Sequence, residues 1–388
     1  MEKKKWLLGE VLDNYDYLRK PLSSMQRESF KGDYPYYGAQ GIIDYVADYR
    51  YDGEYLLIAE DGENLSSRTA PIAQIAKGKY WVNNHAHVVK NNGNSDLYYI
   101  CYLLNHSDIA GYVTGSAQPK LSQRNLEKIK IELPSLHVQR RIASILSAYD
   151  NLIENNTRRI RLLEQMAENI YKEWFVRFRF PGHENAEFEN GLPKGWKEYS
   201  IKELCDINNQ TLSSKDKSKV IEYLDTSSIT CNQISGTECF TVDAAPSRAR
   251  RIVKDNSIVF STVRPNLKHY GILKGIPDNM IVSTGFAVFD AKYDIANIIF
   301  LFLSTQDVVD YCQSIAEGAV ATYPSIKAEE IGRLRIALPE KTIAEKWNKK
   351  FEAIYIEMLN LQRQSNLLAR QRDLLLPRLM SGKLEVKG

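Results

Sequence analysis

Two acidic residues followed by a lysine form the pattern in this sequence that most resembles a catalytic site. Asp278 follows Pro277, and Asp290 and Lys292 flank an alanine further along. In metal-dependent nucleases, two acids in such an arrangement hold Mg²⁺ and a lysine polarises the attacking water. The spacing is loose, and the Ile-Pro-Asp-Asn segment around Asp278 favours aspartate as a turn residue. We therefore keep an autonomous nuclease only as a minor alternative.

Two histidines, His85 and His87, have the spacing of metal ligands on one face of a strand. No third His, Cys, Asp or Glu stands at a recognisable ligand spacing from them. The sequence also has no GxxxxGK[ST] phosphate loop, no glycine-rich nucleotide loop after a strand and no Asp/Asn-Pro-Pro-aromatic tetrad. We expect no metal, no cofactor and no catalytic centre on this chain.

A strongly basic stretch occupies residues 245–274. It contains seven Arg and Lys residues and one acid, so its net charge is +6. Residues 256–263 read as a strand, which places the polar residues after it in a loop. Arginine offers a fork matched to phosphate or to the guanine O6/N7 edge, and asparagine pairs with adenine N6/N7. We predict that this loop contacts DNA; the alternative is a solvated charged surface.

A second set of hydrogen-bond donors lies in the turns of residues 66–89. It resembles the basic stretch in character, although the two do not align. Its members are Arg68, Lys77, Lys79, Asn83, Asn84 and His85.

The chain repeats itself, and this repeat predicts how these loops are positioned. Residues 117–134 (AQPKLSQRNLEKIKIELP) align without a gap to residues 322–339 (TYPSIKAEEIGRLRIALP), at a constant offset of 205. A fainter match joins GEVLD at 9–13 to KELCD at 202–206. The period is too long for a solenoid repeat, so it indicates a duplicated module with pseudo-two-fold symmetry. Such symmetry suits a two-part target.

Each copy of the module ends in a long charged stretch that reads as a helix. From Ile142 the apolar residues follow a heptad, and most of the same positions are apolar 205 residues later. Asn156, Ser365 and Arg372 interrupt this seam. A helix over residues 137–175 is about 58 Å long, more than the roughly 34–36 Å of one DNA turn. We expect the two helices to pair antiparallel; the alternative is that each covers only its own domain.

Composition agrees with an ordinary protein of two or three domains. The chain has 388 residues, is 44% hydrophobic and carries 51 basic and 48 acidic residues, for a net charge of +3. Five cysteines without a CxxC pair indicate reduced thiols. No run is long and apolar enough for a membrane span or a signal peptide, so we expect a cytoplasmic protein without membrane contact.

The sequence resembles the specificity (S) subunits of type I restriction–modification systems over nearly its whole length. The central stretch 133–182, followed by GLPKGW, is similar to that family's central conserved region, and 367–384 to its C-terminal conserved region. Two types of target-recognition domain are also matched, the first by YPYYGAQGIIDYV and YWVNNHAHVV, the second by VFSTVRPNLKHYG and STGFAVF.

This resemblance implies an α+β fold with two mixed α/β target-recognition domains. A pair of long antiparallel helices, a coiled coil, separates them with pseudo-two-fold symmetry. The segments expected are 1–135 (first target-recognition domain), 136–180 (central helix), 181–339 (linker and second domain) and 340–388 (C-terminal helix).

The resemblance further implies a bipartite, asymmetric double-stranded DNA target and catalysis by partners. These are two modification subunits that methylate adenine from S-adenosylmethionine, and restriction subunits that use ATP and Mg²⁺. An alternative is a coiled-coil scaffold that binds DNA by charge alone, which predicts steep salt dependence without sequence preference. The DNA-contacting residues expected are Arg264, Asn266, Lys268 and His269 in a reading loop, Arg248, Arg250 and Arg251 on phosphates, and Asn83, Asn84 and His85 in the first domain with Arg68 and Lys120 in support.

Overall fold

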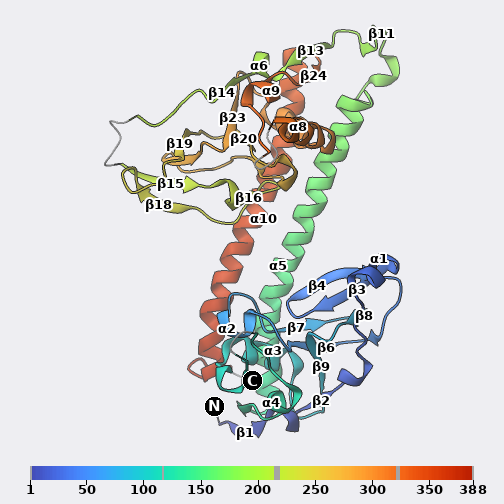
Figure 1. Ribbon diagram of the computed structural model, residues 1–388, viewed down its shortest axis with the longest axis vertical. Helices are drawn as coiled ribbons and strands as arrows, with labels where there is room; N and C mark the ends of the chain where they lie inside the picture. Colours follow the sequence, from blue (N-terminus) through green and yellow to red (C-terminus); the bar gives the residue numbers. More distant parts are fainter. Residues whose placement is uncertain (1, 116–117, 214–218, 320–323, 387–388) are drawn as a thin grey trace. The chain divides into compact units, whose positions relative to one another are not determined.

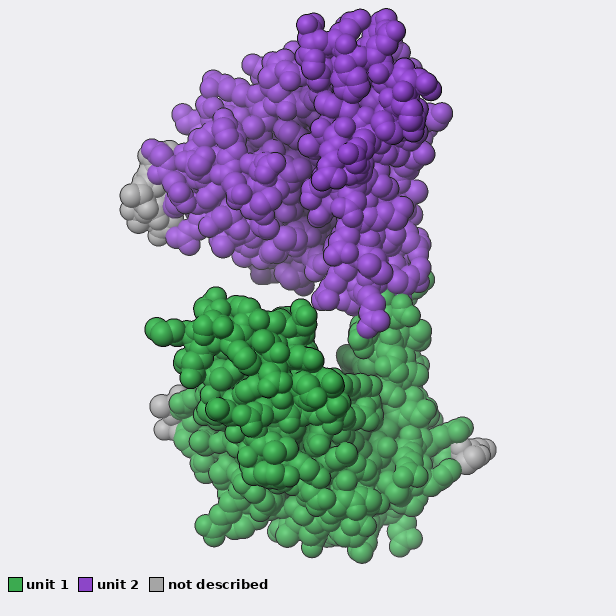
Figure 2. Space-filling model, turned by 90° about the vertical axis from the view of Figure 1, so that its right-hand side faces the viewer, with its two compact units in different colours: residues 1–155, 364–388 green, residues 156–363 purple. Residues whose placement is uncertain are grey.

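The computed structural model describes residues 2–115, 118–213, 219–319 and 324–386. The chain forms two compact units (Figure 2): unit 1 contains residues 1–155 and 364–388, and unit 2 contains residues 156–363. These units divide both long helices, whereas the segments expected from the sequence treated each helix as a separate piece.

Unit 1 contains the first mixed α/β body (Figure 1). Its first sheet has the order β2 (Leu12–Asn14), β9 (Ala86–Asn91), β6 (Tyr55–Ala59), β7 (Ala73–Ala76). Its second sheet has the order β4 (Gly41–Val46), β3 (Lys31–Gly38), β8 (Lys79–Val82), β5 (Tyr51–Asp52). A third sheet pairs β1 (Lys4–Leu7) with β10 (Lys130–Leu133), and the helices are α1 (Ser24–Glu28), α2 (Asn64–Ser67), α3 (Leu97–His106) and α4 (Gln123–Glu127).

Unit 2 contains the second body, built in the same way. Its first sheet has the order β14 (Cys205–Ile207), β23 (Phe286–Ala291), β20 (Ile258–Ser261), β21 (Tyr270–Ile272). Its second sheet has the order β18 (Glu238–Thr241), β15 (Val220–Leu224), β22 (Met280–Ser283), β19 (Ala249–Ile252). The small sheets pair β13 (Lys197–Ser200) with β24 (Arg335–Leu338), β16 (Ile229–Thr230) with β17 (Gln233–Ile234), and β11 (Phe188–Glu189) with β12 (Leu192–Pro193). The helices are α6 (Ile201–Leu204), α7 (Ala296–Leu303), α8 (Gln306–Ala319) and α9 (Ala328–Gly332).

The two bodies share one topology, as the repeat predicts. In each, the second sheet contains a parallel pair, β3 with β8 and β15 with β22, in the same place in the strand order. β10 and β24 lie 205 residues apart, and so do α4 and α9. The central strands β6 and β20 are nearly continuous apolar runs because both of their faces are covered.

The long helices α5 (Leu136–Tyr171) and α10 (Lys341–Ser381) begin 205 residues apart. In unit 1 the start of α5 shares a core with the end of α10, through Ile142 and Leu146 on α5 and Leu379 on α10. In unit 2 the later part of α5 shares a core with the start of α10 (Figure 1), where Ala167 and Phe351 are both buried. The two helices are therefore paired antiparallel, which confirms that expectation.

One polar residue of the seam, Arg372, is paired across the two helices. Arg372 Nη1 lies 2.5 Å from Asp150 Oδ1 on α5, and Tyr102 of α3 donates a hydrogen bond to the same carboxylate. In unit 2, Arg159 lies 2.8 Å from Glu357 across the pair. A polar seam residue such as Arg372 can fix the register of paired helices. In the described residues, no helix combines the length and apolar character needed to cross a membrane.

Candidate nucleic-acid interface

The predicted reading loop of unit 2 joins β20 to β21 through a short 3-10 turn, Pro265–Leu267. Arg264 before this turn and Lys268 after it both adopt left-handed backbone conformations, with φ of 48° and 57°. The Arg264 amide donates to Pro324 O at 3.0 Å, and the Asn266 amide donates to Gln313 Oε1 of α8 at 3.1 Å. Backbone contacts from two neighbouring segments therefore hold this loop in a defined shape.

The four residues predicted to read DNA fall into two pairs. The side chains of Arg264 and Asn266 are exposed and make no hydrogen bond or ion pair with any other described residue. Lys268 Nζ instead donates to Gln306 Oε1 at 2.8 Å, and His269 Nδ1 contacts Ile229 O and Thr230 Oγ1. Arg264 and Asn266 are thus the two that have their full hydrogen-bonding capacity available to a base edge.

The predicted phosphate contacts lie on and beside β19. Arg248 is exposed, and its carbonyl accepts a hydrogen bond from the Thr284 amide at 2.8 Å. The neighbouring Gly285 carbonyl accepts from the Thr262 amide at 2.8 Å, which links this segment to the reading loop. Arg250 and Arg251 are half-buried, and the Arg251 Nε is buried without a hydrogen-bond partner among the described residues.

In unit 1, the same backbone hydrogen bonds identify the counterpart of the reading loop. The Glu60 amide donates to His85 O at 2.9 Å, and the Leu121 amide to Glu60 O at 2.7 Å. In unit 2 the matching bonds run from Thr262 to Gly285 and from Ile326 to Thr262, at 2.8 Å each. The segment that follows β6, residues 60–72, is therefore the counterpart. Asn83, Asn84 and His85 lie in a different connection, between β8 and β9.

The two counterpart loops differ in what they expose. Residues 60–68 contain three acids and one arginine, so the loop of unit 1 is acidic. When Glu60 is matched to Thr262 by these hydrogen bonds, Asn64 and Leu65 correspond to Asn266 and Leu267. Asn64 and Leu65 are 1% and 2% exposed, whereas Leu267 is 47% exposed. This loop of unit 1 therefore turns its amide and leucine inward.

The donors predicted in unit 1 have mixed surroundings. Arg68 Nη2 donates to the carbonyls of Leu104, Asn105 and Ser107, at 3.1, 3.1 and 2.7 Å, and so caps the end of α3. Lys120 Nζ lies 3.3 Å from Glu60 Oε1.

The β8–β9 connection presents the more accessible of these residues. Asn83 is buried, and its Oδ1 accepts from the His85 amide at 2.8 Å. Asn84 and His85 are exposed, and His85 Nδ1 lies 2.8 Å from Asp61 Oδ2. In this body, these two are the predicted residues best placed to meet a base.

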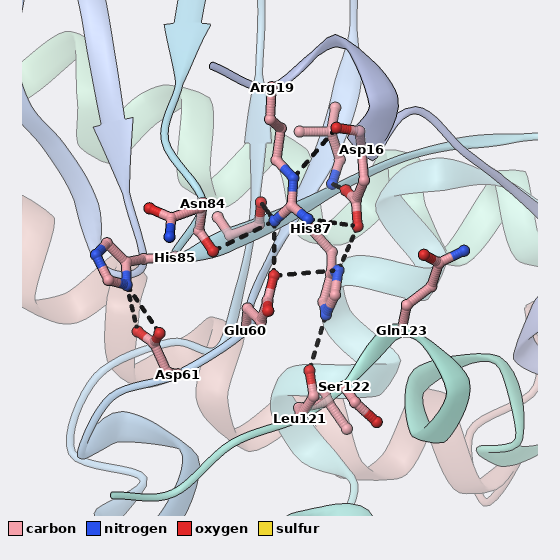
Figure 3. A network of polar contacts seen from close by, with 12 residues as sticks. Asp16, Arg19, Glu60, Asp61, Asn84, His85, His87, Leu121, Ser122 and Gln123 are labelled. Atoms are coloured by element: carbon pink, nitrogen blue, oxygen red, sulfur yellow. Dashed lines mark hydrogen bonds and ion pairs between the residues drawn. The ribbon is translucent and has the colours of Figure 1, made fainter. Parts of the chain in front are cut away.

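A buried polar network lies beneath this connection, and its members are far apart in sequence (Figure 3). His87 is 1% exposed; its Nδ1 contacts Asp16 Oδ2 at 2.6 Å and its Nε2 contacts Leu121 O at 2.8 Å. Arg19 lies between the two acids, 3.1 Å from Asp16 and 2.7 Å from Glu60. The network joins the 3-10 turn Asp16–Leu18 after β2, the residue that follows β6 and the start of β9.

Two acids of this network, Asp16 and Glu60, group with His87 in a cluster that the spacing of His85 and His87 did not suggest, and His85 is not part of it. Ligand atoms of Asp16, Glu60 and His87 lie within 4.8 Å of one another. Local spacing did not reveal them because the three residues belong to distant segments. The Arg19 guanidinium already supplies a positive charge between the two carboxylates, and the Leu121 carbonyl accepts from the outer ring nitrogen of His87. The arrangement is that of a structural ion cluster.

We predict that this network makes unit 1 sensitive to acid. Burial raises the pKa of Asp16, but the hydrogen bond and charge of His87, the Val88 amide and Arg19 outweigh it, so the pKa lies below its usual value. The pKa of Glu60 is lowered in the same way, with burial opposed mainly by Arg19 and His87. Because both folded pKa values lie below the unfolded ones, this stability is present above about pH 4–5 and is lost as pH falls further.

Asp16→Asn should reduce the free energy of unfolding by about 1–3 kcal/mol at pH 7 and flatten its decline between pH 5 and 3. Urea unfolding at a series of pH values measures both effects. Asp33→Asn is the control, since Asp33 is exposed. Equal effects of the two variants would contradict the assignment.

The acidic pattern around Asp290 has structural partners. Ser257 Oγ donates to Asp290 Oδ1 at 2.5 Å, and Asp290 is 8% exposed. Lys292 Nζ donates to the carbonyls of Lys202 and Glu203 at 3.2 and 3.1 Å. These bonds account for both residues without a nuclease site.

The chain matches known proteins over most of its length. Residues 3–165 and 193–367 match the family described as type I restriction modification DNA specificity domain. The chain is 25% identical to the type I restriction enzyme MjaIX specificity subunit of Methanocaldococcus jannaschii, over 94% of this chain and 90% of that protein. It is 39% identical to a putative type I restriction enzyme specificity subunit of Haemophilus influenzae, over 36% of each chain.

A solved structure shares the fold. The crystal structure of a type I restriction-modification system S subunit from M. genitalium superposes with a TM-score of 0.62, at 13% identity, covering 98% of this chain and 96% of that one.

Proposed function

Because this chain belongs to the type I restriction modification DNA specificity family, we propose that its two bodies each read one part of a bipartite, asymmetric DNA target. Members of this family are the specificity subunits of type I restriction–modification systems and work, as non-catalytic subunits, in complexes with DNA. Each body holds side chains against base edges in the major groove, and the paired helices α5 and α10 set the separation of the two parts. A cytoplasmic location follows from such a target.

One observation carries this proposal. The same strand connection recurs in both bodies with the same backbone hydrogen bonds, yet its side chains differ. A duplicated scaffold with different exposed residues suits a target whose two parts differ in sequence. In unit 2 the exposed pair is Arg264 and Asn266, whose types match guanine and adenine edges.

A comparison of genomic methylation tests this function. Methylation-aware sequencing of the host, with and without the gene, should reveal a bipartite adenine motif that disappears with the deletion. Loss of a continuous motif, or no loss at all, would reject the proposal. A scaffold that binds DNA only by charge predicts no motif and steep salt dependence.

The catalytic partners we propose are two modification subunits and, in the complete enzyme, restriction subunits. S-adenosylmethionine, ATP and Mg²⁺ would belong to those partners, and none to this chain. The repeat supports a pair of equal docking sites: Leu162 on α5 and Leu367 on α10 lie 205 residues apart and are 59% and 60% exposed. We propose that one modification subunit packs against each of these two exposed leucines.

We predict that Leu162→Glu and Leu367→Glu each remove one modification subunit, because each places a charge in an apolar contact. The double variant should bind none. Mass measurement of the assembled complex gives the number of subunits directly. Leu152→Glu is the matched control, since Leu152 is 52% exposed on α5 but has Glu357 at its repeat position. Full assembly by the double variant would contradict the docking sites.

A further inference from the structure

The hydrogen bonds of His269 determine what kind of base edge its ring can read. We propose, on the basis of the proposed function, that the free Nε2 of His269 accepts a hydrogen bond from the exocyclic amino group of an adenine or a cytosine. The residue therefore selects an A or C at one position of the part of the target read by unit 2. The inference follows from the proton position that the fold imposes on the ring.

The fold places the proton of the neutral ring on Nδ1. This nitrogen lies 2.7 Å from Ile229 O and 3.0 Å from Thr230 Oγ1. A backbone carbonyl has no proton, so the short contact with Ile229 requires Nδ1 to donate. A neutral imidazole has one N–H, and its other nitrogen is then an acceptor. The Ile229 carbonyl thus fixes the tautomer in which Nε2 carries a lone pair.

Among the described residues, the ring forms hydrogen bonds only through Nδ1. No carboxylate lies within ion-pair distance of His269 in the parts of the chain that the structure describes, and its nearest charged neighbour in sequence is Lys268. Nε2 makes no hydrogen bond to any described residue, and the side chain is partly exposed. The ring therefore offers one free acceptor beside the donors of Arg264 and Asn266.

The β16–β17 hairpin sets the ring in place before DNA arrives. The Cys231 amide donates to Lys268 O at 2.9 Å, and the Asn232 amide donates to Tyr270 O at 2.8 Å. Asn232 Oδ1 also accepts from the Ile272 amide at 2.8 Å. The residues on both sides of His269 are therefore bonded to the hairpin that holds its Nδ1.

A glycine allows the hairpin to approach this closely. A Cβ at Gly271 would lie 2.5 Å from Ile229 Cδ1 and 2.8 Å from Asn232 Oδ1. The site is thus built for a fixed ring orientation, which is the condition for discrimination by one hydrogen bond.

An acceptor in the major groove separates adenine and cytosine from guanine and thymine. Adenine and cytosine present amino donors, N6 and N4, at this edge. Guanine presents O6 and N7 and thymine presents O4, all of them acceptors that a lone pair on Nε2 does not bind. Arginine only donates and the asparagine amide both donates and accepts, so His269 adds a group whose free nitrogen only accepts.

A base-analogue cycle tests the assignment in the complex with modification subunits. Binding-site selection first locates the position whose preference His269→Ala relaxes; we expect A or C there. At that position, purine replaces adenine, or 2-pyrimidinone replaces cytosine, so that only the amino group is removed. This change should weaken binding by wild type about ten-fold and should not weaken binding by His269→Ala further. Thr230→Val is the control, because it keeps the Ile229 carbonyl and should retain the wild-type preference.

Several outcomes would overturn the inference: an unchanged preference in His269→Ala, a selected G or T, or an equal amino-group effect in both proteins. Retained preference in the other part of the target shows that the variant is folded. If His269→Ala loses base preference in both parts of the target, the same measurements are repeated with His269→Gln, whose side chain can still accept a hydrogen bond. A complex with no sequence preference at all would instead reject the proposed function.

Discussion

Arg264→Ala should abolish the preference for one base pair in one part of the target and leave the other part unchanged. The side chain is exposed at a left-handed backbone position that backbone hydrogen bonds hold in place. A bidentate arginine–guanine contact contributes about 1–3 kcal/mol of discrimination, which corresponds to roughly 5–150-fold in affinity. Binding-site selection with the assembled complex measures the change at every position.

A control variant must show how much DNA binding changes when one positive charge is removed elsewhere. Arg333→Ala removes the same charge from the C-terminal end of α9, where the guanidinium pairs with Glu330 at 2.9 Å. This variant should keep both preferences and change binding only slightly. A uniform loss across both parts of the target in Arg264→Ala would mean that Arg264 holds a phosphate, because phosphate contacts carry no sequence information.

Much of the fold was predictable because the repeat constrains it. The 205-residue offset predicted that strands β10 and β24 occupy equivalent positions and that helices α5 and α10 begin at equivalent positions, and the structure shows both. The heptad predicted the helix pairing because a long apolar stripe must be buried. The repeat predicted that the two bodies share a topology, but the particular strand order could not be predicted, because it depends on contacts between segments far apart in the sequence.

The site was predictable in its residue types and less so in its partners. Sequence placed Arg264, Asn266, Lys268 and His269 in one loop, and the structure agrees. It did not separate the exposed pair from the bonded pair, because Gln306 and Ile229 lie about 40 residues away. In unit 1, a likeness of composition led to Asn83, Asn84 and His85, while shared hydrogen bonds identify another connection as the counterpart. Contacts between residues far apart in the sequence determine which loop residues are exposed and which connection of unit 1 is the counterpart.

Phe351→Ala should destabilise unit 2 by about 3–5 kcal/mol. Phe351 is fully buried on α10, and its ring lies 6.0 Å from that of Trp174 and 6.4 Å from that of Phe175, both of which follow in the chain from α5. Truncation leaves a cavity where the two helices meet, and surrounding aromatic rings cannot close it without shifting. Urea unfolding of the isolated chain measures the loss.

Ile356→Ala on the same helix provides the comparison, because Ile356 is 48% exposed and its truncation should change stability by less than about 0.5 kcal/mol. DNA-binding measurements then distinguish a role of Phe351 in stability from a role in setting the gap of the target. If the helix pair sets the spacing of the target, Phe351→Ala should tolerate targets whose gap differs by a base pair while still preferring the same bases in each part. Unchanged selectivity for gap length, together with a large loss of stability, would show that the spacing is fixed elsewhere.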